Sequence, residues 1–167
     1  VTGAAETINL TVRTDPSYSL GRTATAQVRL VSATMDFAQW KAVKFPGNTV
    51  PVAEFVNLDS DGDHLLNAVE YGFGFDPTVA NANPPGLPRP VVVDGHLGVR
   101  FTRPIASVDL DYLIEVSSDL VNWELADDFI EQPGVLGSNG IETVTFVDPL
   151  PTTYSRNRYI RVSVVLY

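Results

Sequence analysis

The sequence predicts a mainly β protein in which two short helices flank an acidic loop and a β-sandwich forms the C-terminal part. Three observations carry this prediction. Polar and apolar residues alternate, as in half-buried strands, over 6–12, over 22–31 and repeatedly after residue 90. Apolar residues recur at helical spacing over 36–45 and 65–73. Between those two helices, side-chain oxygens recur at the spacing of a calcium loop.

The first two strands are expected to form an antiparallel pair. Alternate residues of 6–12 and of 22–31 are apolar, and the turn signal Asp15-Pro16-Ser17 lies between the two segments. Two strands alone are only marginally stable in water. We therefore expect residues 1–35 to be a partial β segment that packs on something else.

Residues 36–77 are predicted to form a helix–calcium loop–helix unit. Asp36 stands at the N-cap position of the first helix, and Pro46-Gly47 ends that helix and opens a loop over 46–53. The apolar stripe predicts that the second helix runs from about Leu65 to Phe73. Gly72, Gly74 and Asp76-Pro77 are the residues that end this helix.

The rest of the chain is predicted to be a proline-rich linker followed by a sandwich. Residues 78–90 contain four of the twelve prolines, which is typical of an irregular linker. Residues 91–167 then read as a β-sandwich. The expected strands are 90–93, 97–102, 111–118, 121–126, 141–147 and 157–166, with a tight turn at Asp94-Gly95.

The composition excludes several classes of function. With 11 basic and 20 acidic residues, the net charge of -9 argues against nucleic acid or an anionic membrane surface as the main partner. The absence of cysteine excludes disulfides, thiolate metal sites and cysteine nucleophiles. No apolar run approaches the roughly 20 residues that span a bilayer. We also expect no enzymatic activity, because Asp94 and His96 are too isolated to form a catalytic triad.

Residues 59–70 carry the chemistry that the sequence predicts. Oxygens recur at the first, third, fifth, seventh, ninth and twelfth positions of this segment, which is the ligand spacing of a calcium loop. Ca²⁺ takes about six to eight hard oxygens, more than Mg²⁺ usually takes from a protein, so calcium is the expected ion. The predicted ligands are the side chains of Asp59, Asp61, Asp63, Asn67 and Glu70 and the main-chain carbonyl of Leu65.

One residue departs from the usual pattern of such a loop. The sixth position normally holds glycine, but here it holds His64, while Gly62 stands at the fourth position. Histidine adopts a left-handed backbone less readily than glycine, so we expect a lower affinity or an altered loop. The alternative interpretation is a solvated, aspartate-rich turn that only caps the following helix.

The stretches FAQWKAVKF and LDSDGDHLLNAVEYGFGFDP resemble a module near the C-termini of large secreted or surface proteins of Verrucomicrobia and Planctomycetes. Its loop is similar to the thrombospondin type 3, dockerin and EF-hand calcium loops. The resemblance covers roughly residues 37–77, and DYLIEVSSDLVNWE and RNRYIRVSV look like the β-domain that follows in such proteins. The matching loop residues are Asp59, Asp61, Gly62, Asp63, Leu65, Asn67, Glu70, Tyr71, Gly74, Asp76 and Pro77, whereas His64 does not match. Residues 6–32, with the turn Tyr18–Gly21, look like the last two strands of a Calx-beta domain.

Together these observations predict a calcium-stabilised structural module of an extracellular or cell-surface bacterial protein, such as an adhesin, a matrix component or a filament subunit. We expect the chain to be a piece of a longer protein, and its partners to be neighbouring domains or further copies joined by inter-chain strand addition. The alternative is a carbohydrate-binding or other accessory β-sandwich of a secreted enzyme. Exposure of Tyr112 and Trp123 on one flat face would favour a glycan as partner.

Overall fold

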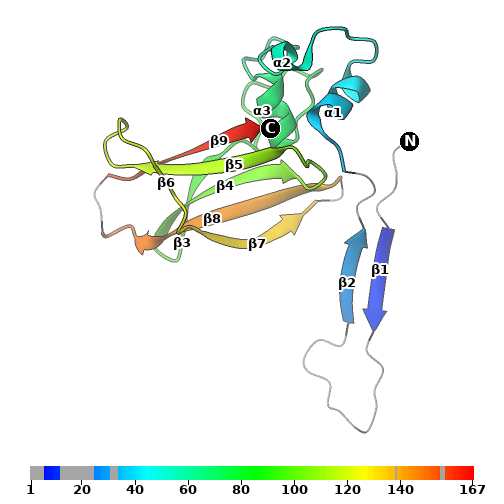
Figure 1. Cartoon of the computed structure of the whole chain (residues 1–167). Coiled ribbons are helices and arrows are strands. Elements are labelled where there is room, and N and C mark those ends of the chain that lie inside the picture. The colour runs from blue at the N-terminus through cyan, green and yellow to red at the C-terminus, as the bar shows by residue number, and fades with distance from the viewer. Residues whose placement is uncertain (1–5, 12–24, 31–33, 138, 155–156) are drawn as a thin grey trace. The chain divides into compact units, whose positions relative to one another are not determined.

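The computed structural model of this chain describes residues 6–11, 25–30, 34–137, 139–154 and 157–167 (Figure 1). The chain divides into two compact units, Val1–Thr34 and Met35–Tyr167. The predicted helix–loop–helix unit, linker and sandwich all fall within the second unit.

The first unit contains the predicted antiparallel strand pair. β1 (Glu6–Thr11) pairs with β2 (Thr25–Leu30) in a register that runs from Glu6↔Leu30 to Thr11↔Thr25. The predicted turn at residues 15–17 and the Calx-beta-like turn at residues 18–21 lie outside the described residues.

Two of the short helices of the second unit correspond to the predicted ones. α1 (Phe37–Lys44) begins with a capping box, because Asp36 Oδ1 accepts the N–H of Gln39 at 2.7 Å and Gln39 Oε1 accepts the N–H of Asp36 at 3.1 Å. α3 (Asn67–Phe73) begins two residues later than predicted, because Leu65 and Leu66 still belong to the loop. Gly74, at φ 79°, ends it in the left-handed conformation that glycine adopts without strain.

A third helix was not predicted from the periodicity. α2 (Val52–Phe55) is a single turn after Pro51, within and just beyond the segment 46–53 that the sequence predicted as loop. Four residues are too few to show a helical period. Phe55, which is 1% exposed, anchors this turn in the core.

Seven strands of the second unit form two antiparallel sheets that face each other as layers in Figure 1. One sheet has the order β3-β4-β8-β7 and the other the order β6-β5-β9. The strands are β3 (Arg89–Val93), β4 (His96–Pro104), β5 (Leu110–Ser117), β6 (Glu124–Leu125), β7 (Ile130–Leu136), β8 (Ile141–Pro151) and β9 (Tyr159–Leu166). The predicted C-terminal β-sandwich is therefore present.

Two strands differ from the prediction for local reasons. β7 was not expected, because Pro133-Gly134 interrupts its pattern, and its register with β8 shifts between Gln132 and Val135. The strand predicted over 121–126 is reduced to the two residues of β6. Its first residues instead form a turn in which Asp119 Oδ1 accepts the N–H groups of Val121 and Asn122, both at 2.8 Å.

The hydrophobic interior that the described residues of the second unit form consists of two clusters, and α3 contributes to both. The sandwich cluster has as its buried members Phe73, Val99, Phe101, Ile114, Val116, Ala126 and Val144. The aromatic cluster has as its buried members Phe37, Trp40, Phe55 and Tyr71. Phe73 and Tyr71 lie two residues apart on α3, so this helix joins the helical part of the unit to the sandwich.

Asp109, just before β5, ties the aromatic cluster to the second sheet. Its Oδ2 accepts the N–H of Phe37 at 2.8 Å, and its Oδ1 accepts the hydroxyl of Tyr71 at 2.6 Å. Hydrogen bonds to a carboxylate are among the stronger ones in proteins. One carboxylate therefore fixes the start of α1 and the middle of α3 against the strand layer.

Gly72 allows α3 to approach β9 closely. A Cβ at this position would lie 2.7 Å from Cγ2 of Val164 on β9. Gly72→Ala should therefore overpack the contact and lower the free energy of unfolding by about 1–3 kcal/mol, as measured by urea denaturation. Val164→Ala should recover part of this loss in the double variant, whereas strictly additive effects would contradict the close contact.

Candidate metal centre

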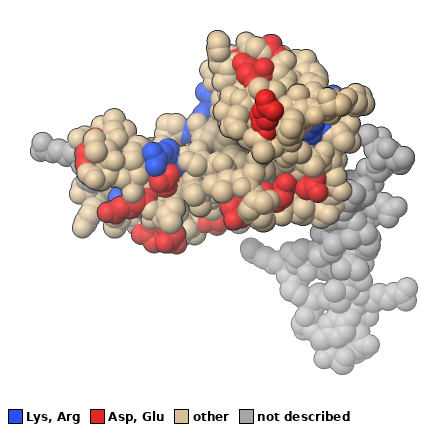
Figure 2. All heavy atoms as spheres, turned by 45° about the horizontal axis from the view of Figure 1, so that its top comes forward, with Lys and Arg blue, Asp and Glu red and all other residues tan. Residues whose placement is uncertain are grey.

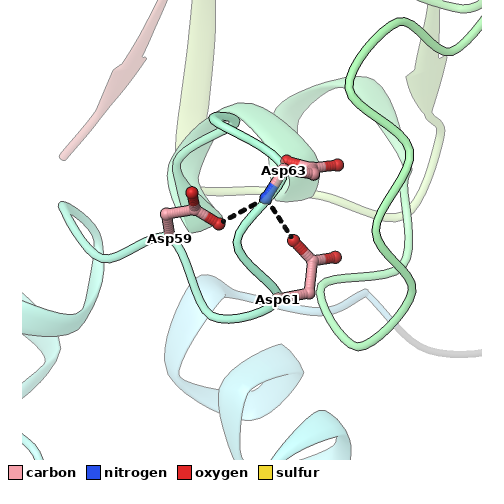
Figure 3. A group of neighbouring side chains, drawn as sticks. All are labelled: Asp59, Asp61 and Asp63. Carbon is pink, nitrogen blue, oxygen red and sulfur yellow. Dashed lines mark hydrogen bonds between the residues drawn. The ribbon is translucent and has the colours of Figure 1, made fainter.

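The segment between α2 and α3 is a tight loop in which aspartate carboxylates accept hydrogen bonds from the main chain. Asp59 Oδ1 accepts the N–H of Gly62 at 2.8 Å, and its Oδ2 accepts the N–H of His64 at 2.9 Å. Asp63 donates its N–H to Asp59 Oδ1 at 3.2 Å and to Asp61 Oδ1 at 3.3 Å, as Figure 3 shows. Asp63 Oδ1 in turn accepts the N–H of Leu65 at 2.8 Å. Alternate side chains thus turn toward the centre of the loop.

The left-handed turns of the loop fall on Gly62 and His64. Their φ angles are 83° and 74°. His64 therefore takes the conformation for which this position normally uses glycine, and the loop closes with histidine in that place. The loop therefore accommodates histidine in place of glycine, with some backbone strain at His64.

The three loop aspartates gather their carboxylates into one cluster. One oxygen from each of Asp59, Asp61 and Asp63 lies within 4.8 Å of the others. Burial and the neighbouring charge of Asp63 raise the pKa of Asp61 above its usual value, whereas hydrogen bonds from the loop, first that of His64, lower the pKa of Asp59. This cluster can hold a metal ion.

Two fully buried side chains of α3 leave oxygens without partners beside this cluster. Glu70 and Asn67 are both 0% exposed. Among the described residues, neither Oε1 nor Oε2 of Glu70, nor Oδ1 of Asn67, nor Oδ2 of Asp61 has a hydrogen-bond partner. Asn67 is held from its other side, because its Nδ2 donates to the carbonyl of Phe55 at 2.9 Å. Buried polar atoms are normally satisfied, so these oxygens favour an electropositive partner at this place.

The electrostatics of Glu70 lead to the same conclusion. Burial, followed by the charges of Asp61, Asp63 and Asp59, raises the pKa of Glu70 to about 8. The donor set of carboxylates and an amide oxygen suits a hard cation. The residues present therefore fit a metal ion, which would offset the burial and the mutual repulsion of these groups.

The structure places each predicted ligand in or next to the loop. Asp59, Asp61 and Asp63 form the cluster, and Asn67 and Glu70 lie on α3, which follows it. Leu65 is half-buried at the end of the loop. Asp76, which is not among the predicted ligands, forms an ion pair with Lys44, whose Nζ lies 2.8 Å from Oδ2.

One neighbour of the site was not foreseen. Asn81 donates its N–H to Asp63 Oδ2 at 2.7 Å, so the segment predicted as a linker lies against the loop. A main-chain N–H group is present in every residue except proline, so the residue type does not reveal this contact. The segment 78–90 also has no periodic pattern from which its position could be predicted. Together with Leu65, this contact engages both carboxylate oxygens of Asp63.

The aromatic side chains considered for glycan binding do not share a flat exposed face. Tyr112 packs against Phe101 with ring centroids 5.2 Å apart, and its hydroxyl donates to the carbonyl of Gly72. Trp123 is half-buried, and the guanidinium of Arg161 lies 4.3 Å from its ring centroid. Trp123 also lines a pocket with Pro88, Leu97 and Tyr159, so the glycan alternative stays a prediction.

Comparison with known proteins gives no match to a family model, a curated protein or a solved structure. The resemblance to surface-protein modules stays a prediction for that reason. Among the described residues, the helices are too short and too polar for any of them to traverse a membrane. Acidic side chains are spread over the face drawn in Figure 2, and the basic ones on that face form no continuous patch.

The raised pKa of Glu70 predicts an unusual pH dependence in the absence of divalent cations. Because this pKa is about 8 in the folded protein, against 4.5 for an unperturbed glutamate, the folded state favours the protonated form. The contribution of Glu70 to stability is then complete below pH 4.5 and is lost as the pH rises through 8. In a chelator, melting temperatures of the wild type should fall over this range relative to those of Glu70→Gln. Parallel pH profiles would refute the buried, unpaired state of Glu70.

Proposed function

We propose that this chain is a calcium-binding structural module of an extracellular or cell-surface bacterial protein, such as an adhesin, a matrix component or a filament subunit. The observation that carries the proposal is the fully buried Glu70, whose two carboxylate oxygens have no hydrogen-bond partner in the described part of the chain and lie beside the clustered loop aspartates. A metal ion would satisfy these oxygens and neutralise part of the charge around them. The fold then acts as a scaffold that the ion stabilises.

Calcium fits this donor set better than other common ions. All the proposed donor atoms are oxygens, from carboxylates, one side-chain amide and one main-chain carbonyl. None of them is a thiolate or an imidazole, the ligands that zinc and copper prefer. The ligands would be Asp59, Asp61, Asp63, Asn67, Glu70 and the carbonyl of Leu65. That number of protein oxygens suits Ca²⁺, because Mg²⁺ usually retains several waters.

Ion binding would act on the whole second unit through α3. Glu70 lies next to Tyr71, a member of the aromatic cluster, and three residues before Phe73, a member of the sandwich cluster. Fixing Glu70 therefore fixes the helix that both clusters share. The predicted role of the ion is to make the joint between the helical part and the sandwich rigid.

At the extracellular location that the proposal includes, the ion would take the place of disulfides, which a chain without cysteine cannot form. Calcium in millimolar amounts outside the cell would add stability even at micromolar affinity. Neighbouring domains and further copies of the chain are the expected partners, with inter-chain strand addition as the mode of assembly.

A calcium titration followed by thermal melting tests the proposal. At a free calcium concentration of about 100 times Kd, the wild type should gain about 2.7 kcal/mol of stability. Asp61→Ala and Glu70→Gln should lose most of this gain, because the first removes a ligand and the second replaces a bidentate, charged carboxylate with a single neutral amide oxygen. Glu54→Gln removes an exposed carboxylate of α2 and should keep the full calcium effect.

Magnesium at the same concentration should give a much smaller gain than calcium. The proposal fails if calcium and EDTA give the same melting temperature for the wild type, or if Glu54→Gln abolishes the effect as strongly as Glu70→Gln does.

A further inference from the structure

Within the described residues, the two sheets of the second unit end in four edge strands, and three of these strands carry features that discourage pairing. β3 carries Arg89 and Pro90, and β7 carries Pro133 together with its register shift against β8. β6 is only two residues long and pairs with β5 only at Glu115 and Val116. Proline, bulges, charges and short length are the usual means by which proteins prevent edge strands from adding further strands.

β9 is the fourth edge, and it has no proline, no bulge and no shortened length. It is eight residues long, contains no proline and pairs with β5 without any register shift. Its single charged side chain, Arg161, is already engaged by Glu115 on β5, with Nε and Nη2 at 2.7 and 2.8 Å from the carboxylate oxygens. Four of its residues are β-branched, which favours the extended conformation.

The side chains of β9 are also incompletely covered. None of its eight residues is buried, in contrast to Ile114 and Val116 on the adjacent β5. On its outward face, Tyr159 and Val165 are 38% and 40% exposed. A long, regular and apolar strand whose outer edge is paired with no other described strand is the kind of edge that accepts another strand.

We propose that β9 pairs with β9 of a second copy of this chain in an antiparallel, two-fold arrangement centred on Val162. The three-stranded sheets of the two copies would then join into one continuous sheet. This inference deepens the assembly part of the proposed function, by naming the edge and the partner, and it does not depend on a bound ion.

The proposed register follows from cross-strand pairing. Centring on Val162 places Tyr159 opposite Val165 of the second copy, so that the two exposed apolar side chains cover each other. It also places Ile160 opposite Val164 and Arg161 opposite Ser163. Centring on Arg161 instead would set two like charges against each other, and centring on Ser163 would leave Tyr159 beyond the end of the partner strand. The favoured register is self-complementary, as a two-fold interface requires.

The mass of the full-length chain in solution, measured by light scattering and sedimentation, tests the proposal. The wild type should form a species of twice the 18.1 kDa chain mass. Ser163→Lys sets a lysine against Arg161 of the second copy and should weaken the dimer at least about tenfold, whereas Ser163→Glu should tighten it. Val92→Lys adds the same charge to a 67% exposed position on β3 and should leave the dimer unchanged.

The absence of native cysteine permits a test of the register itself. Tyr159→Cys and Val165→Cys chains should form a disulfide when they are mixed. Each variant alone should not, because its two cysteines would lie six residues apart along the paired strands, roughly 20 Å. Thermal melting and circular dichroism of every variant would show that it is folded.

Each outcome decides the proposal. A wild type that stays monomeric overturns it, as does a dimer that Ser163→Lys leaves intact while the variant is folded, or a dimer in which the mixed cysteine pair does not cross-link. Repeating the measurements in calcium and in EDTA separates the two proposals. A dimer in both media with no calcium effect on melting would refute only the calcium site, and a calcium effect on a monomer would refute only the pairing.

Discussion

The burial of Glu70 is the constraint on which the rest of the second unit depends. This carboxylate is 0% exposed, finds no hydrogen-bond partner among the residues that the structure describes, and lies beside three clustered aspartates. Such a group is costly in any fold unless a positive charge compensates it. The chain nevertheless places it on α3, the helix shared by both hydrophobic clusters. The packing of the aromatic cluster and the sandwich therefore positions the charged site, and the state of the site acts back on that packing.

In the loop over residues 59–66, hydrogen bonds between side chains and main chain bring the aspartates together. Asp59 uses its oxygens to accept the N–H groups of Gly62 and His64, and these bonds bend the chain so that Asp61 and Asp63 lie near it. The same carboxylates that shape the loop thus make up the cluster. Asn81 adds a donor from the following segment, so that residues well outside the loop take part in its geometry.

The features that the sequence predicts are those formed by residues close together in the chain. The spacing of Asp59, Asp61, Asp63 and Glu70 predicted the clustered site because all its residues lie within twelve positions, and the capping residue Asp36 marked the start of α1. Features set by distant or irregular contacts were missed. The single turn of α2 has no period, β7 is broken by Pro133-Gly134, and the contact of Asn81 with Asp63 is made through the main chain. The hydroxyl of the half-buried Tyr112 donates to the carbonyl of Gly72, 40 residues earlier, a contact that no local pattern reveals.

The carboxylate of Asp109 has a consequence for the order in which the chain folds. Its hydrogen bonds reach Phe37, 72 residues away in the chain, and Tyr71, 38 residues away. Forming these contacts closes long loops, and the loss of chain entropy precedes the gain from the hydrogen bonds. Helices as short as α1 and α3 have little stability by themselves. We therefore expect the helical part to gain its final packing only once β5 is in place, which makes the aromatic cluster a late step of folding although its residues come early in the second unit.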